Sequence, residues 1–176
     1  MTNPSAAPAS GAMIPDPQQQ FLDAFRKEHA TTRKVLRAFP REQSEFTPHE
    51  RSNTARQLAY TFLLEQKLLM AAFTDTLRLT GKMPPMPDDF GAIVDEFERD
   101  FDQLCGIIEA AAPESLTVPV QFPVGPGQVG DWPKLQFAWF MLCDQIHHRG
   151  QLSVYLRMVG GKVPSIYGPS GDERWF

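Results

Sequence analysis

The segment CDQIHHRGQLSVYLR, residues 143–157, decides how this chain is expected to fold. Apolar residues within and around it recur at steps of three and four, which is typical of one face of an α-helix. Asp131 and Pro133 before it, and Gly160 and Gly161 after it, are good start and stop signals, so we expect a helix over residues 134–159. One face of that helix carries Phe137, Met141, Asp144, His148, Gln151, Tyr155 and Met158.

Polar groups interrupt the middle of this face. Asp144 and His148 are four residues apart, so their side chains lie one turn apart on the same side, which we expect to face inward. A buried carboxylate needs a partner. A shared metal ion is one solution, and a hydrogen bond between the two groups is another; the spacing leaves both open. His147 is rotated by about a quarter turn and is expected at a flank or an interface.

Three earlier segments also have helical periodicity and end signals. They are residues 18–39, which follow Asp16-Pro17 and stop at Pro40; residues 54–80, for which Ser52, Asn53 and Thr54 offer caps and which stop at Gly81; and residues 90–112, which follow Asp88-Asp89. Four amphipathic helices predict an all-α four-helix bundle, one domain over residues 16–176. Residues 1–15, rich in proline, alanine and serine, are expected to form a flexible tail.

The connection between the third and fourth expected helices, residues 114–132, is long and contains prolines and glycines among valines. A hairpin there is conceivable, but Pro119 and Pro123 argue against a full pair of strands. We therefore expect an irregular connection.

Two other helices carry polar residues on apolar faces. Thr61 and Glu65 interrupt the face of the second helix, and His29 lies on the apolar stripe of the first. Glu65 could join Asp144 and His148 or extend to solvent at the edge of the bundle. His29 could be a hydrogen-bonded core residue, a ligand or a proton carrier.

The composition argues against several function classes. The net charge is −4, from 17 basic and 21 acidic residues, which does not suit a nucleic-acid binder. No stretch approaches ~20 apolar residues, so no membrane span is expected. The two cysteines form no CxxC motif, which fits a reducing cytoplasm.

Residues 147–173, HHRGQLSVYLRMVGGKVPSIYGPSGDE, closely resemble the C-terminal signature of the DinB/YfiT-like family of small bacterial four-helix bundles. Residues 38–66 resemble its passage from the first to the second helix. The resemblance implies an up-down-down-up bundle, frequently a homodimer. It also implies a zinc or nickel ion, held by three histidines, that activates a low-molecular-weight thiol in transferases and isomerases.

Only part of that ligand set is present in this chain. His148 matches the second histidine of the family's HxxxH pair, and the first falls on Asp144. The histidine of the second helix falls on Thr61, or on Tyr60 if the alignment slips by one. Glu65, one turn along, is our own candidate replacement. We therefore expect a metal site of Asp144, His148 and Glu65, with Thr61, Tyr60, His29, Gln151 and His147 as further pocket residues.

Two hypotheses follow. In the first, the protein is a metal-dependent thiol transferase or hydrolase acting on a small thiol or another small ligand. In the second, it has lost the metal and is a small-molecule binding module or a dimeric interaction module. A surplus of aromatic residues, Trp132, Trp139, Phe140, Tyr167, Trp175 and Phe176, favours a homodimer unless the tail covers the bundle. Arg149 could bind a carboxylate in the C-terminal tail, such as Asp172 or Glu173.

Overall fold

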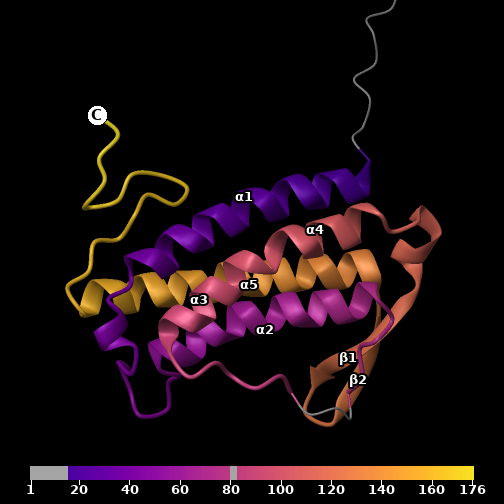
Figure 1. Ribbon diagram of the computed structural model, residues 1–176, viewed down its shortest axis with the longest axis horizontal. Helices are drawn as coiled ribbons and strands as arrows, with labels where there is room; N and C mark the ends of the chain where they lie inside the picture. The colour runs from indigo at the N-terminus through magenta and orange to yellow at the C-terminus, as the bar shows by residue number, and fades with distance from the viewer. Residues whose placement is uncertain (1–15, 80–82) are drawn as a thin grey trace, which may run out of the picture.

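The computed structural model describes residues 16–79 and 83–176, most of which are helical (Figure 1). The expected tail, residues 1–15, lies outside this part. The helices are α1 (Pro17–Ala38), α2 (Ala55–Phe73), α3 (Phe90–Arg99), α4 (Phe101–Glu109) and α5 (Lys134–Met158), with short 3-10 turns at Arg41–Gln43 and Pro113–Thr117. Among these described helices, none is long and apolar enough to cross a membrane.

The helices form four columns, because α3 and α4 lie end to end on either side of Asp100 (Figure 1). In Figure 1, α1 and α5 run in one direction, whereas α2 and the α3–α4 column run in the other. This is the up-down-down-up order. Helix α5 packs against both α1 and α2, so its two sides are covered by neighbours that run in opposite directions.

Side-chain caps explain where three of the helices begin. The Asp16 carboxylate accepts a hydrogen bond from the Gln19 amide at 3.3 Å, and Asp89 accepts one from the Ala92 amide at 2.9 Å. Thr54 and Gln57 form a reciprocal capping box at the start of α2. These were the start signals in the sequence, and they satisfy amide groups that have no partner inside the helix.

Helix α2 is shorter than expected, since it ends at Phe73 and not near residue 80. The amides of Thr76 and Leu77 both donate to the Ala71 carbonyl, at 2.8 and 3.0 Å. Asp75 between them and the helix has φ 57°, in the left-handed region. Aspartate tolerates this conformation better than most residues, so the chain turns there before it reaches Gly81.

The expectation of a purely all-α fold is wrong for residues 119–133. Strands β1 (Pro119–Gly125) and β2 (Gln128–Pro133) form an antiparallel hairpin beside the helices (Figure 1). Both are edge strands, where a proline can lie without removing a ladder hydrogen bond. The turn contains Pro126 and then Gly127, whose φ is 67°. Proline followed by glycine is a common sequence in tight turns.

The core consists of two apolar clusters, one toward each end of the bundle. The first contains Phe25, Leu69 and Leu142 at its inner boundary. The second begins with Val35 on α1, Leu63 on α2 and Leu152 on α5. Between them lie six buried polar side chains, here called the polar layer: His29, Thr32, Glu65, Gln66, Gln145 and Arg149. The bundle is therefore polar at its middle, where most bundles are apolar.

The C-terminal segment folds back toward α1 (Figure 1), and Arg149 binds it differently from our prediction. Arg149 is 1 % exposed, and its guanidinium lies 2.7 Å from the Glu28 carboxylate and 2.6 Å from the Tyr167 hydroxyl. Asp172 instead pairs with Arg157, and Glu173 accepts from the Ser165 amide at 2.7 Å. Arg149 therefore joins the C-terminal segment to α1, through Tyr167 and Glu28.

Candidate metal centre

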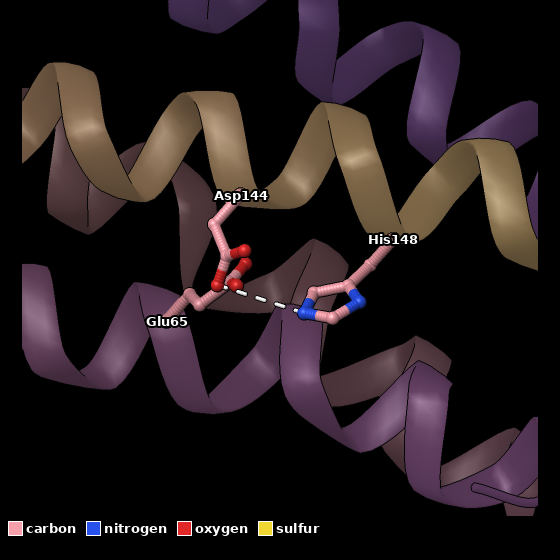
Figure 2. A group of neighbouring side chains, drawn as sticks. All are labelled: Glu65, Asp144 and His148. Carbon is pink, nitrogen blue, oxygen red and sulfur yellow. Dashed lines mark ion pairs between the residues drawn. The ribbon is translucent and has the colours of Figure 1, made fainter. Parts of the chain in front are cut away.

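Glu65, Asp144 and His148 come together between α2 and α5 (Figure 2). Each offers one ligand atom, and these three atoms lie within 4.8 Å of one another. Nε2 of His148 lies 3.5 Å from Oδ2 of Asp144. Figure 2 shows the carboxylates of Glu65 and Asp144 side by side, with the imidazole ring of His148 turned toward them.

Two elements position the group. The helical repeat of α5 places Asp144 and His148 one turn apart on the side that faces α2. Glu65 comes from α2, which packs against α5, and it belongs to the polar layer. The side chain of Asp144 is 38 % exposed, whereas that of His148 is 19 % exposed, so the group is open to solvent on one side.

Glu65 is the residue whose environment is most unusual. It is 3 % exposed, and neither of its carboxylate oxygens has a hydrogen-bond partner among the described residues. Burial raises the pKa of Glu65 well above its ordinary value, and the neighbouring Asp144 carboxylate raises it further. Two facing carboxylates are stable only with a proton or a cation between them, so this position needs one or the other.

Gln151 fixes the orientation of His148. Its Oε1 lies 3.3 Å from Nδ1 of His148, and its Nε2 lies 2.8 Å from Nε2 of His147. With the proton of His148 on Nδ1, that nitrogen donates to the amide oxygen, and Nε2 keeps its lone pair on the side of Asp144. A ligating histidine is held in this way by the hydrogen bond of its other nitrogen.

The donor set fits a divalent cation. Two carboxylates and one neutral imidazole can bind zinc, nickel or a harder ion such as manganese. Three protein ligands leave at least one position for water or substrate. A cation would also provide the missing partner for the two buried oxygens of Glu65.

A pocket of about 450 Å³ opens beside His148. Arg51, Ser52 and Asn53, from the connection between α1 and α2, form one wall, and His148, Gln151 and Tyr155 of α5 form the other. The Tyr155 hydroxyl donates to the Asn53 carbonyl at 3.2 Å, which ties the two walls together. The candidate ligand His148 is therefore accessible to a small molecule.

The two alternatives for the ligand on α2 make hydrogen bonds of their own. Thr61 is half-buried, and its hydroxyl donates to the Gln57 carbonyl of its own helix at 3.1 Å. The Tyr60 hydroxyl donates to the carbonyl of Pro84, in the connection after α2. Neither is part of the three-residue group, which takes Glu65 from α2.

His29 belongs to the polar layer and is not one of the three grouped residues. It is 5 % exposed and stacks on Phe97 and Phe101, with ring centroids 4.5 and 3.5 Å away. Its Nδ1 lies 3.2 Å from Nε2 of Gln66. Burial, with a smaller contribution from the charge of Arg33, lowers the pKa of His29 to about 3. It is therefore neutral at physiological pH, which does not suit a proton carrier.

Three residues near the site were not singled out by sequence reasoning. Gln66 and Gln145 are each 1 % exposed, and each has one amide atom without a hydrogen-bond partner among the described residues. Arg51 lines the pocket. The only signal for the glutamines was a polar residue at a core position of the helical repeat, and nothing local marked Arg51. His147 is exposed, as predicted for a flank.

Comparison with known proteins identifies the family. The sequence matches the DinB family over residues 13–174. The chain belongs to the DinB family. It is 23 % identical over 154 residues to the uncharacterised protein YrdA of Bacillus subtilis, which covers 87 % of this chain and 89 % of that protein.

Two solved structures of DinB-like proteins have the same fold. One, from Bacillus cereus, has a TM-score of 0.69 and 22 % identity, and the match covers 85 % of this chain and 97 % of the other. The second, YjoA of Bacillus subtilis, has a TM-score of 0.67 and 17 % identity, over 84 % and 97 % of the two chains. The resemblance seen in residues 147–173 is thus confirmed, and the fold is mostly helical with one small sheet.

Proposed function

We propose that this DinB family member binds a divalent metal ion through Glu65, Asp144 and His148 and acts as a thiol transferase or hydrolase on a small molecule. The observation that carries the proposal is the buried carboxylate of Glu65, which has no hydrogen-bond donor among the described residues and faces two further ligand atoms within 4.8 Å. Zinc and nickel are the ions proposed, since both bind imidazole and carboxylate together.

Each residue has a role in this proposal. Glu65 and Asp144 neutralise the charge of the ion, and Gln151 holds His148 with Nε2 available. The exposed side of Asp144 and the neighbouring pocket give a substrate access to the site. A divalent cation bound there would lower the pKa of a coordinated water or thiol, which supplies a nucleophile near neutral pH.

The test is metal binding by the purified protein. We expect calorimetric titration with zinc or nickel to show one site, and His148→Ala to remove it. His147→Ala is the matched control, because His147 is the exposed neighbour and is not one of the three grouped residues. Wild-type protein that takes up neither ion at micromolar concentration would refute the proposal.

The alternative is a metal-free binding module, and the environment of Glu65 is the observation that favours it. Its raised pKa allows Glu65 to carry a proton, which would be shared with Asp144 in place of a cation. In that case Asp144→Asn would change the stability of the protein, while metal titration would produce no heat. The same calorimetry therefore separates the two functions.

We also propose that a second copy of the chain covers the outer face of α5. This face carries neutral residues along its whole length: Phe140, Cys143, His147, Gly150, Val154 and Met158. Phe140, Val154 and Met158 are 36 %, 58 % and 55 % exposed, although Met158 was expected to point inward. A Cβ at Gly150 would meet nothing within 4 Å, so none of the described segments fills that space.

An uncharged face can pack against its own copy without bringing like charges together. We expect light scattering to give twice the mass of one chain, and Val154→Lys to give monomers that keep their helical circular dichroism. A wild-type protein that stays monomeric at high micromolar concentration would exclude this interface.

A further inference from the structure

The pocket beside His148 has an uneven charge. Arg51 is its one side chain with a permanent charge, and its other described lining groups are neutral or titratable. None of the ion pairs formed by the described residues includes Arg51. Its chain neighbour Glu50 is exposed and does not line the pocket. The guanidinium is therefore available to a ligand.

The loop that carries Arg51 is held in place by its own hydrogen bonds. The Thr47 hydroxyl donates to the His49 carbonyl at 2.7 Å, and the Arg51 amide donates to Nδ1 of His49 at 3.1 Å. The Ser52 amide donates to the His49 carbonyl at 2.9 Å. Tyr155 fixes the end of the loop through Asn53. A preformed wall of this kind costs a ligand less ordering entropy than a free loop would.

The charge beside His148 differs from the charge at the loop wall of the pocket. Next to His148, the carboxylates of Glu65 and Asp144 would balance the charge of a divalent cation, which leaves no net charge there. At the loop wall, Arg51 remains positive and forms no ion pair with another described residue. A guanidinium group binds carboxylate and phosphate groups well. The positive charge of the pocket is therefore concentrated at Arg51.

We infer that this pocket binds small molecules that carry an anionic group, a carboxylate or a phosphate, which Arg51 holds while the rest of the molecule extends toward His148. The inference rests on the proposed function, because it assigns a substrate class to the same site. We therefore expect the pocket to bind an anionic ligand more tightly than an uncharged ligand of the same shape.

The experiment compares mercaptopropionate with its uncharged amide on cobalt-loaded protein. Both probes carry the same thiol, and the visible spectrum of cobalt reports binding without any assay of activity. We expect the wild type to bind the carboxylate about threefold to tenfold more tightly than the amide. Arg51→Gln should remove this preference, and Arg51→Lys should retain part of it. Cobalt affinity should be unchanged in both variants, since Arg51 is not one of the three grouped residues.

The matched control is Arg33→Gln, which removes the same charge from an exposed position on α1. It should keep the preference for the carboxylate, which excludes an effect of net charge alone. An equal affinity for the two probes, or an unchanged preference in Arg51→Gln, would overturn the inference and leave the metal site intact. Protein that binds no cobalt would overturn the proposed function and this inference with it.

The phosphate arm uses inorganic phosphate as a competitor of mercaptopropionate. Competition in the wild type that is lost in Arg51→Gln assigns both anions to the same position. Competition that persists equally in Arg51→Gln would overturn the assignment of phosphate to Arg51.

Discussion

Oδ2 of Asp144 lies 3.5 Å from Nε2 of His148, one helical turn further along α5. The family resemblance implies a histidine at the position of Asp144. The Asp144–His148 pair therefore differs from the ligand set that the resemblance implies. The site consequently presents more oxygen and less nitrogen than a three-histidine site, and oxygen ligands favour harder ions.

Asp144→His should shift the metal preference toward zinc and nickel. We expect the ratio of zinc affinity to manganese affinity to rise about tenfold or more, because imidazole is a softer ligand than carboxylate. Competition titrations of the two ions measure it. Cys143→His is the control, since it adds a histidine at an exposed neighbouring position; an equal shift in that variant would show that the added histidine acts outside the group.

Glu65→Gln should have opposite effects with and without metal. In chelator-treated protein, the pKa of Glu65 is higher in the folded state than in the unfolded state. Burial of Glu65 therefore lowers the unfolding free energy increasingly as pH rises above the pKa of the unfolded state. The neutral amide removes this effect, so we expect a gain of roughly 1–3 kcal/mol in unfolding free energy at high pH. With metal present, the same change should weaken binding.

Urea unfolding in chelator at about pH 5 and about pH 8 tests this prediction, because the contribution of Glu65 to stability should fall as pH rises above its ordinary pKa of 4.5. Glu114→Gln, at an exposed position, should behave as the wild type does. An identical change of stability with pH in wild type and Glu65→Gln would contradict the assigned environment of Glu65.

His29 should make the protein less stable in acid. Its folded pKa of about 3 is below the unfolded value of 6.5, so the unfolded chain binds a proton that the folded one excludes. The contribution of His29 to the unfolding free energy is fully present above the unfolded pKa of 6.5. It is lost as pH falls toward the folded pKa, by about 1.4 kcal/mol per pH unit. His29→Phe should remove that part of the slope, measured by denaturant unfolding across the same range. His49→Gln, at an exposed position, should keep the wild-type slope.

The buried pair of Arg149 and Glu28 should be important for stability. Arg149→Met leaves the Glu28 carboxylate without its 2.7 Å partner, and we expect a loss of roughly 3–5 kcal/mol in unfolding free energy. Adding Glu28→Gln to that variant should recover part of the loss, because the uncompensated charge is removed. Arg157→Met breaks an exposed pair with Asp172 and should matter much less. Equal effects of the two arginine variants would contradict the buried role of Arg149.

The helices were predictable because their signals are local. Asp16-Pro17, Thr54 and Asp89 mark the starts of α1, α2 and α3 in both sequence and structure. The hairpin was not predicted, since two edge strands tolerate prolines that would exclude a central strand. Pro126-Gly127 was the one local signal of its turn. The partner of Arg149 was also missed, because Glu28 lies 121 residues away in the chain.

The sequence by itself determined that Asp144 and His148 share one side of α5, because the backbone hydrogen bonds of a helix fix its period whatever surrounds it. Only the tertiary structure brought Glu65 of α2 next to this pair. That placement depends on how α2 is rotated and shifted against α5. The packing of the two apolar clusters on either side of the polar layer sets this relationship, and no local pattern in α2 or α5 contains it.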